Sequence, residues 1–333
     1  VAALLGCRPG EIVFTSCGSE SDNLALRGAA LARREQTGAD RILTARTEHP
    51  AVSRTAGALE KHHGFRVEWL DVDESGAVRP ETLAKAICKD TALVSIMYAN
   101  NEIGTINPVA ELAAVCRAHD VPFHTDAVQA AAYLPVEVDA LGVDLMSLGA
   151  HKFYGPKGVG ALYVREGTPL VPYLSGGGQE SGRRAGTSNV PYIVGFAEAL
   201  HLTVAEREQR IAQVKPLRDH LIGAVLETIP HSLLTGSSSN RLPNHASFVF
   251  RGVDGNALLQ ALDAAGFACS SGSACKTGSP EPSEVLAALG LSRDWALGSL
   301  RLTLGTGSTP GEIESFLAVL PEKVARLRAL LSI

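Results

Sequence analysis

Two ionisable residues near the middle of the chain have types and settings suited to cofactor chemistry. Lys152 closes the segment Gly149–Lys152, directly after the apolar run Asp144–Leu148. A lysine amine at a strand end, among small residues, can form a Schiff base with a carbonyl cofactor. Asp126 follows another apolar run, Val121–Thr125, where a buried carboxylate needs a cation such as a protonated ring nitrogen. Considered singly, each residue is better explained in an ordinary way, Lys152 as a solvated loop lysine and Asp126 as the N-cap of a helical turn.

The segment Ser16–Ser21 has the composition of a phosphate-binding turn. It separates an apolar run from a helical pattern. Small residues such as Gly18 and Ser19 let backbone N–H groups and a hydroxyl contact a phosphate at the positive end of a helix. A capping box is the ordinary alternative, because Ser16 and Ser19 both have good N-cap side chains, and the two interpretations are compatible.

Two further polar segments follow predicted strands. His49 stands in Glu48-His-Pro50, and its imidazole could stack on a flat ring and move protons near neutral pH. Asn101 stands in Asn100–Gly104, and its amide could hydrogen-bond a ring hydroxyl. Either residue alone also fits an ordinary turn, since His and Asn are common there.

The elements that must position these residues alternate between strands and helices from Glu11 to about Val164. Strands are expected at Glu11–Thr15, Arg41–Ala45, Thr91–Tyr98, Val121–Thr125 and Asp144–Leu148, and helices at Ser19–Arg34, Ala51–His63 and Val109–His119. This alternation predicts an α/β fold with a mainly parallel sheet flanked by helices. In such sheets ligands bind beyond the carboxyl ends of the strands, where the polar residues above are found.

The pattern changes after Val190. A long helical stretch runs to about Thr228, a strand is expected at His245–Phe250, and a last helix begins after Pro310. The sequence therefore predicts a large α/β domain over residues 1–195 and a smaller α+β domain over residues 196–333.

Composition narrows the class of protein. The 333 residues are 45% hydrophobic and 20% charged, which is typical of globular proteins. A net charge of -5 predicts no general attraction to nucleic acid or to an anionic membrane, and no apolar run approaches the ~20 residues that span a bilayer. The cysteines are Cys7, Cys17, Cys88, Cys116, Cys269 and Cys275. Their spacing predicts no metal site and no disulfide scaffold, so a cytoplasmic location is expected.

Six motifs in one order give the sequence a family resemblance. They are Thr15–Asn23, Thr47–Val52, Asn100–Gly104, His124–Gln129, His151–Gly158 and Ser271–Cys275. Together they resemble the cysteine desulfurases, a pyridoxal-phosphate (PLP)-dependent branch of the class V aminotransferase-like enzymes, over essentially the whole chain. Any one motif has an ordinary structural explanation, but the ordered set does not. The resemblance implies a PLP-transferase fold of type I.

The resemblance also implies roles around the cofactor. Lys152 would hold PLP as a Schiff base, Asp126 would pair with the pyridinium nitrogen, and His49 would stack on the ring and shuttle protons. Further contacts would come from Gly18, Ser19 and His151 at the phosphate, from Asn101 and Gln129 at the ring hydroxyl, and from Gly149, where many relatives carry a phosphate-binding serine. Thr187 would reach the phosphate of the partner subunit, so a homodimer is expected.

Two residues in the second half would act on the substrate. Cys275 matches the family's nucleophile, in a Ser- and Gly-rich segment typical of an exposed loop, and Lys276 would favour the thiolate. Arg301 matches the arginine that binds the substrate carboxylate, alongside Asn101. The alternatives are a buried structural cysteine and an arginine on an edge strand.

The implied activity is removal of sulfur from L-cysteine, giving L-alanine and a persulfide on Cys275. An iron–sulfur scaffold or a tRNA-thiolation protein would accept the sulfur. Selenocysteine lyase activity is a close alternative. A truncated, catalytically silent dimer or scaffold is another, because the chain opens at Val1 without methionine, in a helical pattern ending at Gly6, and lacks the family's N-terminal segment. A plain transaminase is disfavoured because it has no use for Cys275.

Overall fold

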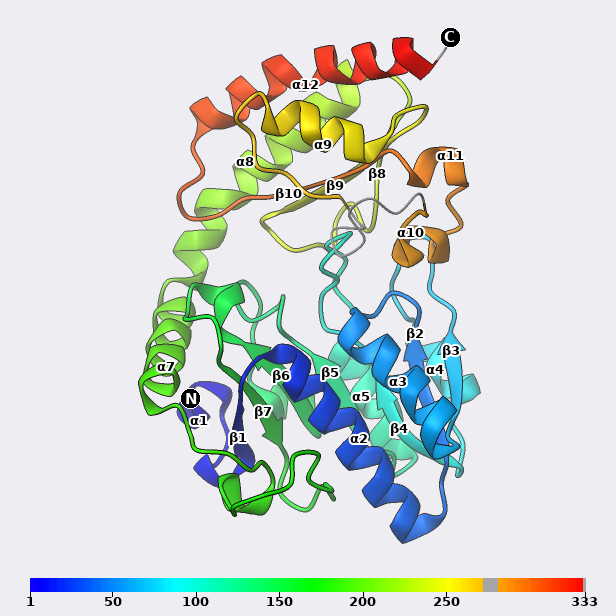
Figure 1. The fold of residues 1–333 in the computed structure, drawn as a ribbon, viewed down its shortest axis with the longest axis vertical. Coiled ribbons are helices and arrows are strands. Elements are labelled where there is room, and N and C mark those ends of the chain that lie inside the picture. Colours follow the sequence, from blue (N-terminus) through cyan, green and yellow to red (C-terminus); the bar gives the residue numbers. More distant parts are fainter. Residues whose placement is uncertain (272–280, 332–333) are drawn as a thin grey trace. The chain divides into compact units, whose positions relative to one another are not determined.

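The computed structural model describes residues 1–271 and 281–331, which form two compact units (Figure 1). Unit 1 comprises Val1–Asp71, Val78–Ala99 and Asn107–Arg207. Unit 2 comprises Val72–Ala77, Asn100–Ile106 and the described part of Glu208–Ile333. Within the described ranges, no helix combines the length and the apolar character needed to cross a membrane.

A seven-stranded sheet of described residues forms the centre of unit 1. Its strands are β1 (Ile12–Thr15), β2 (Arg41–Ala45), β3 (Arg66–Leu70), β4 (Thr91–Ser95), β5 (Phe123–Asp126), β6 (Leu145–Gly149) and β7 (Gly160–Val164). Their order is β1-β7-β6-β5-β4-β2-β3. Strands β3, β2, β4, β5 and β6 run parallel, whereas β7 is antiparallel to both β6 and β1. The prediction of a mainly parallel α/β sheet is confirmed.

Helices pack on this sheet (Figure 1). They are α1 (Ala2–Leu5), α2 (Gly18–Thr37), α3 (Pro50–His63), α4 (Pro80–Ala86), α5 (Val109–Ala118), α6 (Val138–Leu141) and α7 (Val190–Ala205), with short 3-10 helices η1 (Pro9–Glu11), η2 (Ala150–Phe153) and η3 (Glu180–Gly182). Helix α2 crosses β4 to β7 and buries Ala25, Leu26 and Ala29 in the core. Burial of a leucine such as Leu26 contributes about 2 kcal/mol. This packing holds the start of α2 just beyond the end of β1.

The carboxyl ends of three parallel strands lead directly to predicted site residues. Strand β2 is followed by the short loop that carries His49, and β5 ends at Asp126. Strand β6 leads into η2, which carries Lys152. Because parallel strands present their carboxyl ends at one edge of the sheet, this edge is where a ligand is expected to bind.

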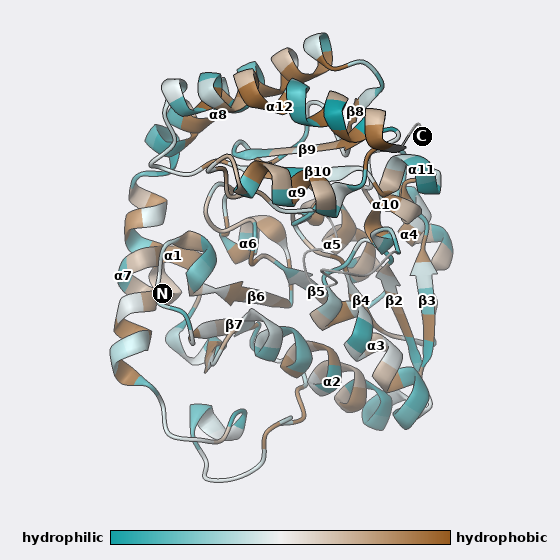
Figure 2. Cartoon of the chain, turned by 45° about the horizontal axis from the view of Figure 1, so that its top comes forward, coloured by the Kyte–Doolittle hydropathy of each residue, from teal (hydrophilic) through white to brown (hydrophobic). Residues whose placement is uncertain are grey.

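Unit 2 is an α+β structure built on a three-stranded antiparallel sheet of described residues. Its strands, in the order β10-β9-β8, are β8 (Ser232–Leu234), β9 (His245–Phe250) and β10 (Ser299–Thr303). Its helices are α8 (Arg207–Thr228), α9 (Gly255–Asp263), α10 (Glu284–Ala288), α11 (Arg293–Ala296) and α12 (Pro310–Leu331). Central strand β9 is buried throughout, and Phe248 and Phe250 anchor the core with Leu258 and Leu320. Figure 2 shows mixed apolar and polar positions along α8 and α12, as expected of helices that bury one face.

The division into units follows long-range contacts. The sequence predicts a boundary after residue 195, whereas α7 belongs to unit 1 as a whole. Phe196 in α7 packs edge-on against Phe14 and Phe153, with ring centroids 6.1 and 5.2 Å apart. Within unit 2, Arg241 Nη2 donates to the carbonyl of Ile103 at 3.0 Å, across 138 positions of sequence. Local patterns do not encode such pairings.

Candidate active site

Asp126 closes β5 and lies buried at the end of the central parallel strands. Its Oδ1 accepts a hydrogen bond from the backbone N–H of Val128 at 2.9 Å. Burial raises the pKa of Asp126, while this hydrogen bond and the positive charges of His49 and Lys152 oppose the rise. Both interpretations of the sequence therefore apply: the carboxylate shapes a turn, and it is a buried acid in need of a cation.

His49 reaches the same region from the loop between β2 and α3. It is the N-cap of α3, and its Nδ1 accepts a hydrogen bond from the N–H of Ala51 at 3.1 Å. In the neutral ring this contact leaves the proton on Nε2. Burial lowers the pKa of His49, which favours the neutral ring, and the charge of Asp126 opposes that effect.

Potential ligand atoms of Asp22, His49 and Asp126 all lie within 4.8 Å of one another. Two carboxylates and an imidazole are groups that could, by type, ligate a metal ion. The same groups could equally surround a flat cationic ring, because a buried carboxylate is stabilised by any adjacent positive charge. The choice between the two depends on the groups around them.

Among the predicted site residues of unit 1, Lys152 brings a positive charge to this cluster. It lies in η2, which Tyr154 ends in a left-handed conformation with φ 66°. The Lys152 side chain is exposed, and its charge lowers the pKa of both Asp126 and His49. Since such effects require proximity, the structure brings these three predicted residues together.

Gly18 and Ser19 begin α2 directly after β1. The N-cap of the helix is Cys17, and no side chain makes a capping hydrogen bond to it. Neither Ser16 nor Ser19 is the N-cap, so the capping box expected from them is wrong; the Glu20 carboxylate accepts instead from the backbone N–H of Ser16 at 2.7 Å. A Cβ on Gly18 would lie 2.6 Å from Cγ2 of Val128, so packing requires glycine at this position.

Gly149 and His151 border the same helix end. A Cβ placed on Gly149 would lie 3.5 Å from the backbone nitrogen of Gly18 and 3.6 Å from Nδ1 of His151. Three residues predicted to bind phosphate thus lie together, beside the positive end of α2. These distances are ordinary van der Waals contacts, so a Cβ at position 149 would fit where this sequence has Gly149.

Gln129 and Thr187 are the other predicted cofactor residues of unit 1. Gln129 is half-buried in the turn that follows β5, three positions beyond Asp126. Thr187 is exposed in the segment between η3 and α7. Its hydroxyl is therefore accessible to another molecule.

Arg301 and Asn101 both belong to unit 2. Nη1 of Arg301 donates to the backbone carbonyl of Asn101 at 2.9 Å, and Nη2 donates to Oγ of Ser270 at 3.0 Å. The backbones of Ser270 and Arg301 are also bridged in both directions. Arg301 is indeed on an edge strand, β10, but it is half-buried and its guanidinium is held in a fixed orientation.

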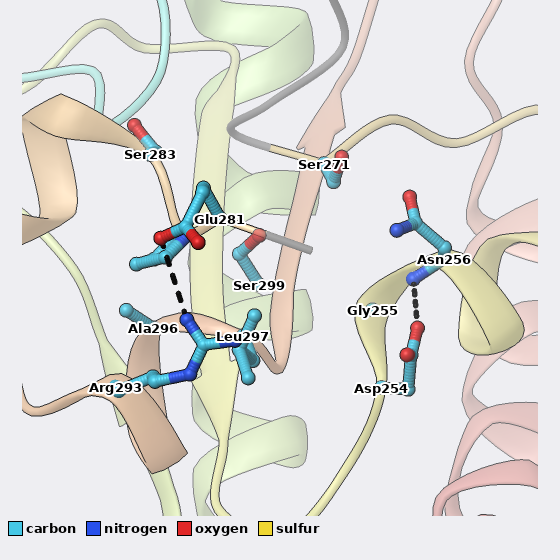
Figure 3. Close-up of a pocket in the computed structure, with 11 residues that line it drawn as sticks. Asp254, Gly255, Asn256, Ser271, Glu281, Ser283, Arg293, Ala296, Leu297 and Ser299 are labelled. Carbon is cyan, nitrogen blue, oxygen red and sulfur yellow. Dashed lines mark hydrogen bonds and ion pairs between the residues drawn. The ribbon is translucent and has the colours of Figure 1, made fainter. Parts of the chain in front are cut away.

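Cys275 and its neighbour Lys276 lie outside the described residues. The residues on either side of that segment, Ser271 and Glu281, line a polar pocket of unit 2 (Figure 3). Arg293 pairs with Glu281 there at 3.4 Å, and the other lining residues are Asp254, Gly255, Asn256, Pro282, Ser283, Ala296, Leu297 and Ser299. None of these is a predicted site residue.

Comparison with known proteins identifies the family. The model of the aminotransferase class-V family matches residues 1–316. The chain belongs to the aminotransferase class-V family. Its relatives in this family include cysteine desulfurase IscS of Dictyoglomus turgidum, which is 46% identical over 330 residues covering 99% of this chain and 83% of the relative. The IscS-like cysteine desulfurase of Mycobacterium tuberculosis is 45% identical over 332 residues, covering 98% and 84%.

Solved structures agree with this assignment. A NifS-like protein has a TM-score of 0.89 at 36% identity, covering 98% of this chain and 86% of that one. The apo structure of a cysteine desulfurase from Thermococcus onnurineus NA1 has a TM-score of 0.85 at 26% identity, covering 98% and 82%. The predicted family, the fold of type I and the enzyme class, cysteine desulfurase, are confirmed.

The class-V family is PLP-dependent, and the residues of unit 1 fit that cofactor. Asp126 is a buried acid that a cationic ring nitrogen would stabilise, and Lys152 is close enough to influence it electrostatically. The start of α2 is a helix end lined by Gly18 and Gly149, where backbone N–H groups can approach a phosphate. These features favour a ring with a phosphate over a metal ion as the ligand of this class-V site.

Three buried residues of the site received no role from sequence reasoning: Asp22, Glu48 and His124. Glu48 Oε1 accepts from the backbone N–H of Met97 at 2.8 Å, and burial raises its pKa well above the usual value. Each of the three stands inside a motif of the class-V resemblance, and Glu48 directly precedes His49. The signal that could have found them is a polar residue within a buried apolar pattern.

Proposed function

We propose that this chain takes sulfur from L-cysteine with PLP held on Lys152, and that Cys275 receives the sulfur. The observation that carries the proposal is the mutual electrostatic influence of Lys152, His49 and Asp126 at the carboxyl edge of the sheet. A surface lysine, a turn histidine and a capping aspartate would have no reason to meet there.

The cofactor contacts follow from the site. PLP, when bound, supplies an electron sink for the electron pair left at the substrate Cα. Asp126 would keep the ring nitrogen protonated, because a buried carboxylate favours an adjacent cation. Gly18, Ser19 and His151 would bind the phosphate, Gln129 and Asn101 would bind the ring hydroxyl, and Gly149 would contribute no hydroxyl of its own.

Two residues of unit 1 would move protons. The amine of Lys152, once the substrate has replaced it on the cofactor, is free to take the α-proton. His49 would hold its proton at Nε2, since Nδ1 is occupied by the N–H of Ala51. Burial keeps the His49 ring neutral, because it lowers the pKa.

Sulfur transfer would then need a carboxylate anchor and a nucleophile. Arg301 would bind the substrate carboxylate, with a guanidinium already oriented by the Asn101 carbonyl and by Ser270. The thiolate of Cys275 would attack the substrate sulfur, so that an S–S bond forms and the substrate C–S bond breaks. The electron pair of that bond stays on the carbon skeleton, which is released as L-alanine after protonation. The persulfide would pass to an iron–sulfur scaffold or a tRNA-thiolation protein.

A homodimer is part of the proposal. Thr187 would contact the phosphate bound by the second subunit, and its exposed side chain supports this role. Large apolar side chains are also exposed in unit 1, namely Tyr154, Tyr173, Leu174, Val190, Tyr192 and Val194. Exposed apolar side chains in one part of a chain are typical of a protein–protein interface.

A cytoplasmic location is consistent with the thiols. Cys7, Cys17, Cys88, Cys116 and Cys269 are free cysteines. Free thiols and a persulfide carrier both persist best in a reducing compartment. Neither of these observations distinguishes one sulfur acceptor from another.

The experiment that tests the function is alanine release from L-cysteine by this chain, supplied with PLP and a reducing thiol. We expect alanine and sulfide in equal amounts. The Cys275→Ser variant should bind PLP with an unchanged visible spectrum and release no sulfide, whereas Cys88→Ser, at a half-buried cysteine of unit 1, should behave as the parent does. Absence of alanine despite bound PLP would overturn the proposed activity.

A further inference from the structure

Asp22 is a buried acid to which the reaction assigns no role. It lies in the first turns of α2, is 1% exposed, and faces the sheet. Its Oδ1 has no hydrogen-bond partner and lies 3.7 Å from Nε2 of His124, beyond hydrogen-bonding distance. Such an oxygen is costly to bury when it is ionised.

His124 does not provide the missing positive charge. Its Nδ1 hydrogen-bonds Oγ of Ser95 at 2.8 Å, and its Nε2 hydrogen-bonds Oγ of Ser147 at 2.9 Å. The ring is fully buried, and burial lowers the pKa of His124 to about 3. At neutral pH the ring is therefore uncharged, and the two serines satisfy it.

The other groups that face Asp22 are mostly acidic. Asp126 comes from β5, Glu48 from the segment before α3, and Cys17 from the N-cap of α2 itself, and all three raise the pKa of Asp22, as burial does most strongly. The Ser147 hydroxyl from β6 opposes the rise. His49 also lies within 4.8 Å, and its ring is kept neutral by burial.

Two carboxylates this close in a buried site cannot both ionise at low cost. The anionic form of Asp126 is supported by the Val128 N–H and by the positive charge of Lys152. Burial and three neighbouring acidic groups oppose the anionic form of Asp22, with only the Ser147 hydroxyl in its favour. A proton shared between the two acids therefore resides on Asp22.

We propose that Asp22 is held as a neutral carboxylic acid and acts as a positioning residue that keeps the negative charge of this cluster on Asp126. The benefit of a neutral Asp22 for cofactor binding rests on the proposed function. The single carboxylate of Asp126 would then face the single positive charge of the PLP ring nitrogen, so that the two buried charges balance. An ionised Asp22 would place a second negative charge beside the same cation.

The direct test is infrared spectroscopy of the PLP-free protein at pH 7.5, as a difference between the parent and the Asp22→Asn variant. We expect a carbonyl band of a protonated carboxylic acid that disappears in this variant and persists in a Glu102→Gln control. If the parent shows no band that depends on Asp22, the inference is overturned. This measurement needs no bound PLP, so failure of the proposed function would leave it decisive.

The consequence is tested by titration with PLP. Because an amide mimics a neutral acid, Asp22→Asn should bind PLP within about 3-fold of the parent and keep the pH dependence of its visible absorbance. A loss of affinity beyond about 10-fold, or a shifted titration, would show that the ionised form of Asp22 matters. The PLP-free Asp22→Asn protein should also melt at a higher temperature than the parent at pH 8 and at a similar temperature near pH 4.

Discussion

The two units treat buried charge in opposite ways. In unit 1, Asp22 and Glu48 each bury a carboxylate oxygen that has no hydrogen-bond partner, and burial raises the pKa of both. In unit 2, the guanidinium of Arg241 is equally buried but donates to backbone carbonyls, those of Ile103, Thr235, Ser237 and His245. Burial lowers the pKa of Arg241 only to about 10, so it stays charged at neutral pH.

This difference in hydrogen-bond partners distinguishes a ligand-binding site in unit 1 from a structural arginine in unit 2. Backbone carbonyls are fixed in place, so the guanidinium of Arg241 is satisfied without a ligand. Asp22 and Glu48 each keep one oxygen without a hydrogen-bond partner and burial favours their neutral forms, so a cationic ligand would stabilise the negative charge that remains on Asp126. A buried charge that lacks compensation therefore marks the place where a ligand belongs.

The largest effect is expected from removing the lysine of unit 1. Lys152→Ala should abolish the visible absorbance of bound PLP and reduce alanine formation by about 10³-fold or more, because the Schiff base and the base are both lost. Absorbance and alanine release measure it. The exposed Lys61→Ala is the control, and an unchanged spectrum in Lys152→Ala would refute the assignment.

The Asp126→Asn and Glu48→Gln variants compare two buried acids of unit 1 by their effect on turnover. Loss of the carboxylate that faces the ring nitrogen should reduce the turnover number by about 10² to 10³-fold, because the electron sink weakens. Glu48→Gln removes an equally buried acid and should have a much smaller effect on turnover. Equal losses in both variants would mean that burial, and not the ring contact, explains Asp126.

The role of unit 2 is tested by Arg301→Ala. Loss of a charged hydrogen-bond pair of roughly 1.5–3 kcal/mol predicts a KM for L-cysteine raised about 10- to 100-fold. PLP absorbance should stay unchanged, which steady-state kinetics and spectra check together. The exposed Arg293→Lys serves as the control, and loss of PLP from Arg301→Ala would contradict the separation of roles.

The raised pKa of Glu48 predicts how the stability of the protein depends on pH. Because its folded pKa is raised, the unfolded chain loses this proton first, so the free energy of unfolding falls as pH rises from about 4.5 through the folded pKa. In the PLP-free protein, Glu48→Gln should remove that fall and make the protein more stable than the parent at pH 8. Denaturation at pH 4.5 and pH 8 tests it, and a variant less stable than the parent at pH 8 would contradict the sign.

The smallest effect is expected from Ser270→Ala. It removes the hydrogen bond that the charged Nη2 of Arg301 donates to the Ser270 hydroxyl, while the Asn101 carbonyl still orients the guanidinium, so KM should rise roughly 3- to 10-fold with turnover unchanged. A KM change as large as that of Arg301→Ala would mean that Ser270 contacts the substrate itself.

Several elements of the two units could be predicted because their periodicity is strong. Strand β2 and helix α12 begin where the sequence indicates, and β9 has the predicted bounds. Strands β3 and β7 were missed, and β4 ends three residues before the predicted Tyr98. β3 is an edge strand with a polar, partly exposed pattern, and β7 is recognisable only through its antiparallel pairing with β1 and β6.

The site residues also include some that could be predicted from the sequence and some that could not. Lys152, Asp126, His49 and the phosphate-binding turn could be predicted because strand ends and helix starts leave a local signature in the sequence. The capping box at α2 was wrong, since the helix begins at Gly18 with Cys17 as its N-cap, which leaves Ser16 before the cap and Ser19 inside the first turn. Asp22 and His124 were missed, because the groups that surround them come from other strands and loops, and the sequence does not show which of these lie next to each other.

The sequence by itself determined the family, the alternation of strands and helices, and the residue types that the chemistry requires, because these depend on order and spacing along the chain. Only the tertiary structure decided which acids share one buried cluster, which nitrogen of His49 carries the proton, and which carbonyl orients Arg301. Those are through-space relations between residues far apart in sequence, and their energies depend on burial and distance, which no local pattern encodes.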